Sequence, residues 1–167
     1  MPAPEFDPES MVRVLNGHEV EWVLIGGFAA VIHGSPYVTT DIDVVPEAGA
    51  ENLRRLSSAL RVMHARVWTQ DVPRGLPFDH SAESLAAARI WNLVTDFGRL
   101  DVTFEPLGTG GYEDLIKGSV RLEILDSEVV VASLADVIRS KEAAGREKDR
   151  LTLPVLWRLL EELDEQA

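Results

Sequence analysis

The chain has no cysteine and no long apolar run. Without thiols it can form neither a disulfide framework nor a zinc site built on thiolates. A membrane-spanning helix needs roughly 20 mostly apolar residues, and no stretch of the sequence approaches that length. Residues 1–10 contain neither a basic start nor an apolar segment, so we expect no secretory signal and a cytoplasmic protein.

Positive charge is also scarce. Lys and Arg number 16 against 28 Asp and Glu, which gives a net charge of −12. Broad non-specific binding to DNA or RNA relies on many Lys and Arg side chains that neutralise phosphates, so this balance disfavours it. It leaves room for a local basic pocket, and the simplest role of an acidic surface is solubility.

The hydrophobic content and the spacing of apolar residues are typical of a packed fold. The 167 residues, 46% of them hydrophobic, are enough for one domain with its own core. We expect a single domain over residues 1–167, with a core at 11–131 and a C-terminal helical part at 132–167. Apolar spacing predicts helices at 11–15, 28–33, 50–63, 112–117, 133–144 and 148–163, and strands at 21–25, 40–45, 90–95, 99–104, 121–125 and 128–131.

The two C-terminal helices carry several local signals. Ser133 is predicted to open the first of them, with Asp136 as a weak capping-box match. Pro154 lies inside the second and predicts a kink or a break. Lys141 and Lys148 are seven residues apart, so they would share one face if the first helix continued beyond residue 144.

An acidic pair interrupts the hydrophobic run at residues 40–45. Asp41 and Asp43 lie two apart, so on a strand their side chains point to the same face. Aspartate is depleted in strands, and two adjacent carboxylates repel each other unless a cation lies between them. Mg²⁺ prefers such oxygen ligands. The pair therefore predicts a cation site that holds Mg²⁺, with Mn²⁺ as an alternative.

A glycine pair, Gly26 and Gly27, separates an apolar strand from a short helix. Backbone N–H groups at a helix start favour an anion, and glycine allows a phosphate to approach the backbone closely. Alone, the pair is weak evidence, because a tight turn explains it equally well. Followed by the acidic pair, it predicts a site for a nucleotide and its metal ions.

A third acid, Asp101, lies in another apolar strand, Leu100-Asp101-Val102. Three aspartates on strands could hold two Mg²⁺ ions that bridge an attacking hydroxyl and the phosphates of a nucleotide. The alternative is that Asp101 is a surface residue on an edge strand. The four tryptophans are most simply core or partly buried residues, at positions 22, 68, 91 and 157.

These motifs together resemble the nucleotidyltransferase fold superfamily, in particular the small prokaryotic branch of AbiEii-type toxins and related stand-alone transferases. The resemblance rests on residues 23–27 (VLIGG), 34–36 (GSP) and 39–43 (TTDID), and on a later run at 140–149 (SKEAAGREKD). In that branch a lysine, a later arginine and a following aspartate recur. The resemblance spans about residues 22–160. It implies an α/β fold with a mixed sheet flanked by helices and followed by C-terminal helices.

The resemblance also implies an activity, the transfer of a nucleoside monophosphate from an NTP to a hydroxyl with release of pyrophosphate. It implies that Asp41, Asp43 and Asp101 hold the metals and that Asp101 assists as general base. The implied nucleotide contacts are Gly26, Gly27, Thr40, Lys141 and Arg146. Implied acceptors are tRNA, a protein or a small molecule, and relatives that act as toxins imply an antitoxin partner.

One position departs from the pattern. Many relatives carry an arginine near Tyr37, where this chain has a neutral side chain. A non-catalytic nucleotide-binding or partner-binding module on the same fold is therefore the alternative function. A purely structural acidic domain is a third interpretation, but it leaves the strand aspartates without an explanation.

Overall fold

One mixed sheet organises the computed structural model, which describes residues 4–166. Residues 1–3, at the start of the segment considered for a secretory signal, and residue 167 lie outside the described part. The strands are β1 (Trp22–Ile25), β2 (Asp41–Pro46), β3 (Arg66–Val67), β4 (Ile90–Thr95), β5 (Gly98–Thr103), β6 (Val120–Ile124) and β7 (Ser127–Val131). Their order across the sheet is β3-β4-β5-β2-β1-β7-β6.

The centre of this sheet mixes both strand directions. β2 pairs antiparallel with β1 and parallel with β5, while β1 pairs parallel with β7. The outer pairs β3–β4, β4–β5 and β6–β7 are antiparallel. β5 therefore lies between β4 and β2, so Asp101 is not on an edge strand.

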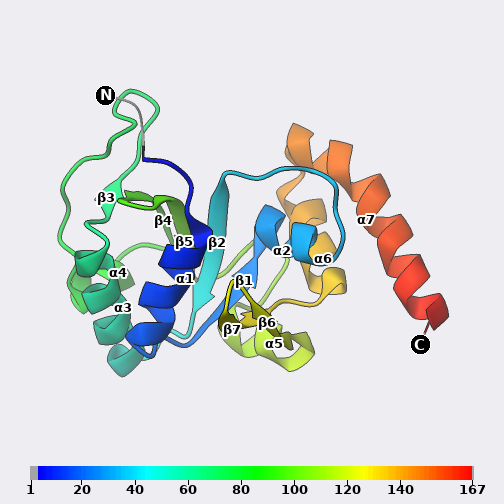
Figure 1. Ribbon diagram of the computed structural model, residues 1–167, viewed down its shortest axis with the longest axis horizontal. Coiled ribbons are helices and arrows are strands. Elements are labelled where there is room, and N and C mark those ends of the chain that lie inside the picture. Colours follow the sequence, from blue (N-terminus) through cyan, green and yellow to red (C-terminus); the bar gives the residue numbers. More distant parts are fainter. Residues whose placement is uncertain (1–3, 167) are drawn as a thin grey trace.

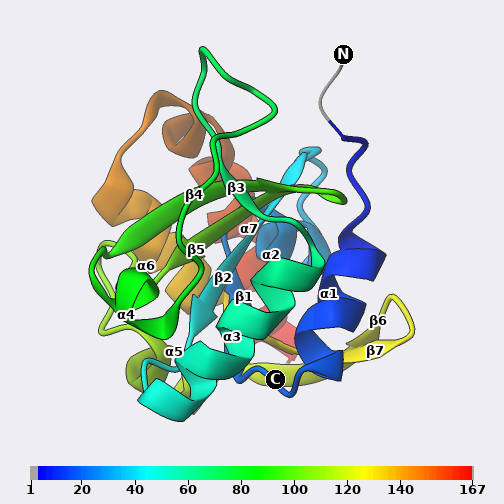
Figure 2. The same cartoon turned by 90° about the vertical axis from the view of Figure 1, so that its left-hand side faces the viewer.

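Helices cover both faces of the sheet. They are α1 (Pro8–Gly17), α2 (Gly26–Ile32), α3 (Ala50–Val62), α4 (Ala82–Ala86), α5 (Tyr112–Gly118), α6 (Leu134–Ala144) and α7 (Glu147–Gln166). Figures 1 and 2 show α1 and α3 on one side of the strands and α2, α6 and α7 on the other. α6 packs on α2, and α7 packs on α6 as the outermost element.

The alternation of side chains in β2 separates core from site. Ile42 and Val44 are fully buried among the apolar residues of the core, whereas Asp41 and Asp43 are only partly buried. Because neighbouring residues of a strand point to opposite faces, the two aspartates face the side of the sheet that carries α2. The acidic pair of the sequence is therefore held rigidly by a buried central strand.

The start of α6 forms as expected, and the two C-terminal helices remain separate. The side chain of Ser133 caps α6 by accepting a hydrogen bond from the backbone N–H of Asp136. α6 ends at Ala144 because Gly145 adopts a left-handed conformation with φ of 60°, so Lys141 and Lys148 do not share a helix. α7 continues through Pro154 without the break considered at that residue, and Leu153 and Leu156 near the proline are buried.

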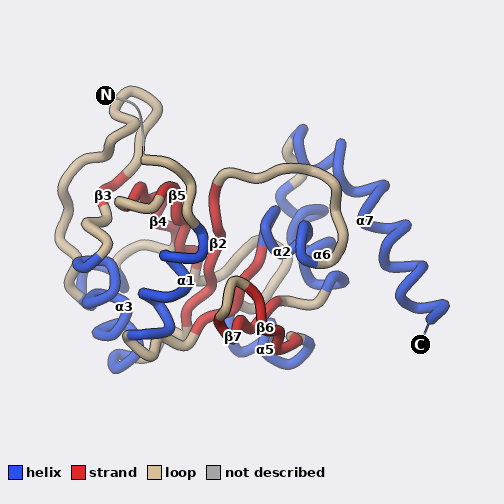
Figure 3. Tube along the Cα trace, viewed as in Figure 1, coloured by secondary structure: helices blue, strands red, loops and turns tan. Residues whose placement is uncertain are grey.

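The region between α3 and β4 holds two elements that the sequence patterns did not predict. They are the two-residue strand β3 and the five-residue helix α4, joined by a long loop that Figure 3 shows beside the outer strands. Leu76 in this loop exchanges two backbone hydrogen bonds with Val67, each 2.8 Å long. Elements this short carry too few residues for a periodic signal.

Within residues 4–166 no helix combines the length and the apolar character needed to cross a membrane.

Candidate metal and nucleotide site

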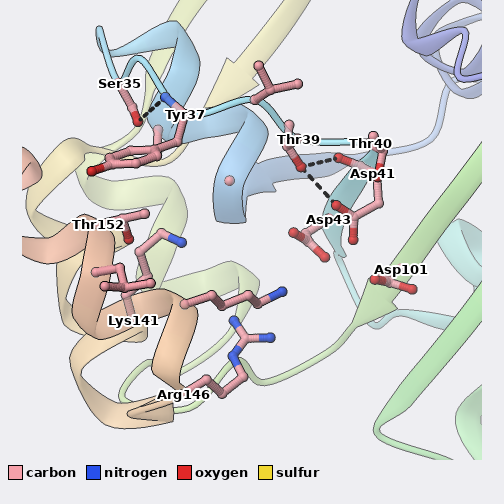
Figure 4. A pocket seen from close by; sticks show the side chains of 15 residues that line it. Ser35, Tyr37, Thr39, Thr40, Asp41, Asp43, Asp101, Lys141, Arg146 and Thr152 are labelled. Atoms are coloured by element: carbon pink, nitrogen blue, oxygen red, sulfur yellow. Dashed lines mark hydrogen bonds between the residues drawn. The ribbon is translucent and has the colours of Figure 1, made fainter.

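Strand pairing brings the three predicted aspartates together. β2 and β5 align in register so that Asp43 lies opposite Asp101, and Asp41 precedes Asp43 on the same face. One carboxylate oxygen from each residue lies within 4.8 Å of the others. Figure 4 shows the three side chains converging from the two strands.

The loop before β2 positions the first aspartate. Thr39 donates its hydroxyl to Asp41 Oδ1 at 2.9 Å and lies 3.3 Å from the Asp41 carbonyl oxygen. These contacts fix one oxygen of Asp41 and appear as dashed lines in Figure 4. The sequence motifs predicted no role for Thr39, although a threonine two residues before an acid is typical of such a local contact.

The three acids disfavour one another's charge. Burial, followed by the charges of Asp41 and Asp101, raises the pKa of Asp43 to about 7. Burial and the contact with Asp41 raise the pKa of Asp101 to about 6, although Arg99 opposes the shift. Each shift reports a cluster of negative charge that lacks compensation from the protein alone.

The donor set fits a hard divalent cation. It consists of three carboxylates, the ligand type that Mg²⁺ and Mn²⁺ prefer. Within residues 4–166 no hydrogen bond from the protein reaches the Asp43 carboxylate, so its oxygens are free to act as ligands. A bound cation would offset the repulsion that raises the pKa of Asp43 and Asp101.

Cationic side chains line the same pocket as the aspartates. The pocket has a volume of about 420 Å³, and Lys141, Arg146 and Lys148 share its wall with the three acids. The charges of Lys148 and Arg146 partly oppose the rise in the pKa of Asp43, which places them within electrostatic reach of it. Such a wall is suited to an anionic group that also contacts the metal site.

A buried acid that the sequence analysis left without a role holds two of these cations. Asp149 has no exposed surface. Arg146 donates to it through Nε at 2.8 Å and through its backbone N–H at 3.2 Å. Lys141 Nζ lies 3.5 Å from its Oδ1. The residue lies in a charged run typical of a solvent-exposed segment. Its three-residue spacing from Arg146 and its place in the resembled motif at 140–149 were the signals of a contact.

The two glycines differ in position. Gly26 begins α2 with φ of 78°, and a Cβ there would lie 2.0 Å from Asp43 Oδ2. Gly26 therefore makes room for Asp43, and it is not part of the pocket lining. Gly27 does line the pocket, next to Thr39. The phosphate contact expected of Gly26 stays a prediction, because this residue contacts Asp43 and does not line the pocket.

The loop between α2 and β2 supplies the remaining wall. Thr40 and Tyr37 line the pocket, and Tyr37 is 45% exposed. In Figure 4 the Tyr37 ring extends away from the three aspartates. Tyr37 therefore presents a neutral aromatic side chain at the pocket rim, at the position where the sequence comparison above noted an arginine in many relatives.

Comparison with known proteins supports the fold. No family model matches the chain. No curated protein matches it by sequence either. Among solved structures, the lincosamide antibiotic adenylyltransferase LnuA with bound lincomycin superposes with a TM-score of 0.61 and 13% identity, covering 93% of this chain and 99% of LnuA.

A second structure is a protein from Thermotoga maritima, provisionally described as a nucleotidyltransferase. It superposes with a TM-score of 0.50 and 18% identity over 93% of this chain and 96% of that protein. At these identities the likeness establishes the fold and not the reaction. The chain therefore has a nucleotidyltransferase-like fold, a mixed sheet flanked by helices and completed by C-terminal helices, as its sequence motifs predicted.

Proposed function

We propose that the protein is a metal-dependent nucleotidyltransferase that moves a nucleoside monophosphate from an NTP to a hydroxyl. The observation that carries this proposal is the shared pocket, in which three converging carboxylates lie across from Lys141, Arg146 and Lys148. A triphosphate with its metal ions has the complementary charge pattern. Phosphoryl transfer needs little from a protein beyond such positioning and charge stabilisation.

The transfer forms one bond and breaks one. The acceptor oxygen attacks the α-phosphorus of the NTP, and the bond from that phosphorus to the oxygen that bridges to the β-phosphate breaks. Pyrophosphate leaves with the bonding electron pair, and the acceptor proton passes to a base. Bound Mg²⁺ would supply Lewis acidity and neutralise the charge that develops on the phosphate oxygens.

Each residue of the site has a role in this proposed reaction. Asp41 and Asp43 hold the metal, while Asp101 holds metal and accepts or relays the proton of the acceptor. Lys141 and Arg146 contact the triphosphate. Gly26, Gly27 and Thr40 form the surrounding backbone surface, where Gly27 and Thr40 line the pocket directly and Gly26 accommodates Asp43.

The finer parts of the proposal rest on the sequence, some on its composition and acidic motif and some on the family resemblance. They are ATP or another NTP as donor, Mg²⁺ or Mn²⁺ as the metal, and RNA, a protein or a small molecule as acceptor. A toxin role with an antitoxin partner, membership of the AbiEii-like branch, a single-domain organisation and a cytoplasmic location belong to the same set. LnuA is described as acting on a lincosamide antibiotic, which favours including small molecules among the acceptors.

The proposal is tested by incubating the protein with Mg²⁺ and each α-labelled NTP in the presence of total RNA, cell extract or small hydroxylated compounds. We expect a labelled acceptor and released pyrophosphate, and neither product should form when a chelator removes the Mg²⁺.

Calorimetry with a non-hydrolysable NTP measures nucleotide binding separately. Lys141→Ala should weaken that binding at least several-fold, because a partly buried charge near the phosphates is lost. Arg13→Ala on α1 is the matched control, and it should bind as the parent does.

A non-catalytic nucleotide-binding module is the second candidate. The neutral Tyr37 at the pocket rim favours it, because a cation at that position would assist the phosphates. Tight, metal-dependent NTP binding together with a failure to release pyrophosphate under every acceptor condition would favour this module over the enzyme. Absence of both metal and NTP binding would exclude both functions.

A further inference from the structure

Arg99 lies beside the metal site but outside the pocket that holds the proposed nucleotide contacts. It precedes Asp101 by two residues on β5, so both side chains point to the same face of the sheet. Arg99 donates through Nη2 to Asp101 Oδ1 at 3.0 Å. It also donates through Nε to the Leu93 carbonyl oxygen of β4 at 3.1 Å. The guanidinium therefore bridges the backbone of one strand and the acid of the next.

The indole ring of Trp68 also contacts the Arg99 guanidinium. The guanidinium carbon of Arg99 lies 3.9 Å from the ring centroid of Trp68. Trp68 follows β3 directly, and its backbone N–H donates to the Asn92 carbonyl oxygen on β4 at 2.9 Å. Both the backbone and the ring of Trp68 are thus held next to the sheet. A cation stacked on a tryptophan face is attracted by the ring electrons, and the attraction is stronger when both groups are shielded from water.

We infer that Arg99, clamped by Trp68, is a positioning residue that makes Asp101 a one-oxygen metal ligand. Asp101 Oδ1 is engaged by Arg99, and among the described residues no protein N–H is bonded to its Oδ2. The clamp fixes the rotation of the carboxylate and leaves one oxygen for the cation. This inference rests on the metal site of the proposed function.

The charge of Arg99 cannot itself explain such a role. A fixed positive charge near the site repels a divalent cation, so its electrostatic effect alone would weaken metal binding. Any gain in metal affinity must come from the orientation of the Asp101 carboxylate. A carboxylate that is already held in place loses less rotational freedom when it binds a metal than a mobile one does. Hydrogen-bond partners of metal ligands commonly contribute 10- to 100-fold to metal affinity in this way. Substitutions that retain the charge of Arg99 therefore separate the two effects.

Two variants of the full-length, metal-free protein test the inference. Arg99→Lys retains the positive charge but loses the planar fork and most of the stacking, and Trp68→Leu loosens the clamp while Arg99 remains. Mn²⁺ binding is measured by electron paramagnetic resonance and Mg²⁺ binding by calorimetry. We expect Arg99→Lys to weaken Mn²⁺ binding about tenfold and Trp68→Leu to weaken it by a smaller factor. Arg89→Lys and Trp157→Leu, at exposed positions, are the controls and should bind as the parent does.

A double variant separates positioning of Asp101 from general loosening of the fold. In an Asp101→Asn background, Arg99→Lys should produce no further loss of Mn²⁺ affinity, because the group through which it acts is already altered. Equal Mn²⁺ affinity in the parent, Arg99→Lys and Trp68→Leu would overturn the inference while leaving the metal site intact. A parent that binds neither Mn²⁺ nor Mg²⁺ would overturn the proposed function and this inference together. Should Arg99→Lys fail to fold, Trp68→Leu alone decides the matter.

Discussion

Asp43 combines burial, two acidic neighbours and no hydrogen-bond donor from the described part of the protein. In the metal-free protein its ionised form is therefore disfavoured, and its folded-state pKa is raised above the value of about 3.9 expected in the unfolded chain. A raised acid pKa means that the folded state binds more protons. Stability is then lost as the pH rises from about 4 through the folded-state pKa.

The Asp43→Asn substitution should separate stability from activity. Without metal, we expect its free energy of unfolding to exceed that of the parent by an amount on the order of 1 kcal/mol or more above pH 7, and to match the parent below pH 4. Urea unfolding across this pH range measures the difference.

In the same variant, the rate of nucleotide transfer should fall about a hundredfold or more, since losing one charge-stabilising element costs on the order of 3 kcal/mol of transition-state stabilisation. A variant that transfers as fast as the parent would show that Asp43 is not a metal ligand.

Asp149 has the opposite electrostatic setting. Burial tends to raise its pKa, but hydrogen bonds and charge from Arg146, with the charge of Lys141, outweigh burial and lower it. Asp149→Asn should therefore reduce the free energy of unfolding by about 1.5–3 kcal/mol at neutral pH, as expected for lost hydrogen bonds to a charged group. Because the lowered pKa stabilises only the ionised form, this difference should shrink as the pH falls below about 4.

The same variant should weaken NTP binding, since Lys141 and Arg146 lose the group that orients them. Calorimetry at pH 7.5 and pH 4 with urea unfolding in parallel checks both effects. Asp164→Asn, on the exposed last turns of α7, serves as the control. An unchanged NTP affinity in a destabilised variant would assign Asp149 a purely structural role.

At the scale of elements, the junction between α6 and α7 determines where the cationic wall stands. Gly145 ends α6 with φ of 60°, and a Cβ added there would lie 3.8 Å from the Glu142 carbonyl oxygen, an ordinary van der Waals distance. Space for a side chain is therefore available, and any loss in the free energy of unfolding would come from the backbone conformation.

Lys141 precedes this turn and Arg146 follows it, so the turn directs both side chains toward Asp149.

Gly145→Ala should lower the free energy of unfolding by about 1 kcal/mol, the cost of a left-handed conformation for an ordinary residue. Gly145→Asn should recover part of that loss, because asparagine tolerates this conformation. Chemical denaturation of the three proteins gives the comparison. If alanine and asparagine destabilise equally, steric crowding and not backbone conformation is the cause.

These elements also show what the sequence could predict. Alternation predicted that Asp41 and Asp43 share one face of a strand, because the period of a strand is a local property, and the apolar run around Asp101 placed that residue on another strand. The pairing of β2 with β5 is not local, so the sequence patterns could not predict the register that places Asp43 opposite Asp101. Asp149 was missed because neighbouring lysine and arginine make its segment look solvated, and burial depends on how α7 packs. Trp68 escaped assignment because β3 is too short to carry a pattern.

On the scale of the whole molecule, a net charge of −12 concentrates cations around the protein without any specific site. The Mg²⁺ site proposed at the three aspartates would add a further effect, because a ligand that binds only the folded state stabilises it by about 2.7 kcal/mol at one hundred times its Kd. For a protein of this size about 1 kcal/mol corresponds to 2–4 °C in Tm.

We therefore expect saturating Mg²⁺ to raise the Tm by about 5–10 °C and a chelator to reverse the rise. Scanning fluorimetry at constant ionic strength, with Na⁺ in the reference sample, removes general screening. Asp41→Asn should lose most of the increase. An equal increase in the parent and in Asp41→Asn would indicate diffuse counter-ion binding in place of a defined site.

The register between β2 and β5 has a kinetic consequence. The two strands are parallel and separated by two helices and two further strands along the chain, so their pairing closes a long loop. Contacts of this kind form slowly, and often late, during folding. Asp43 and Asp101 meet only when that pairing is complete, so the cation affinity proposed for them should appear as one of the last events of refolding. The metal site would thus distinguish molecules that have finished folding from compact intermediates that have not.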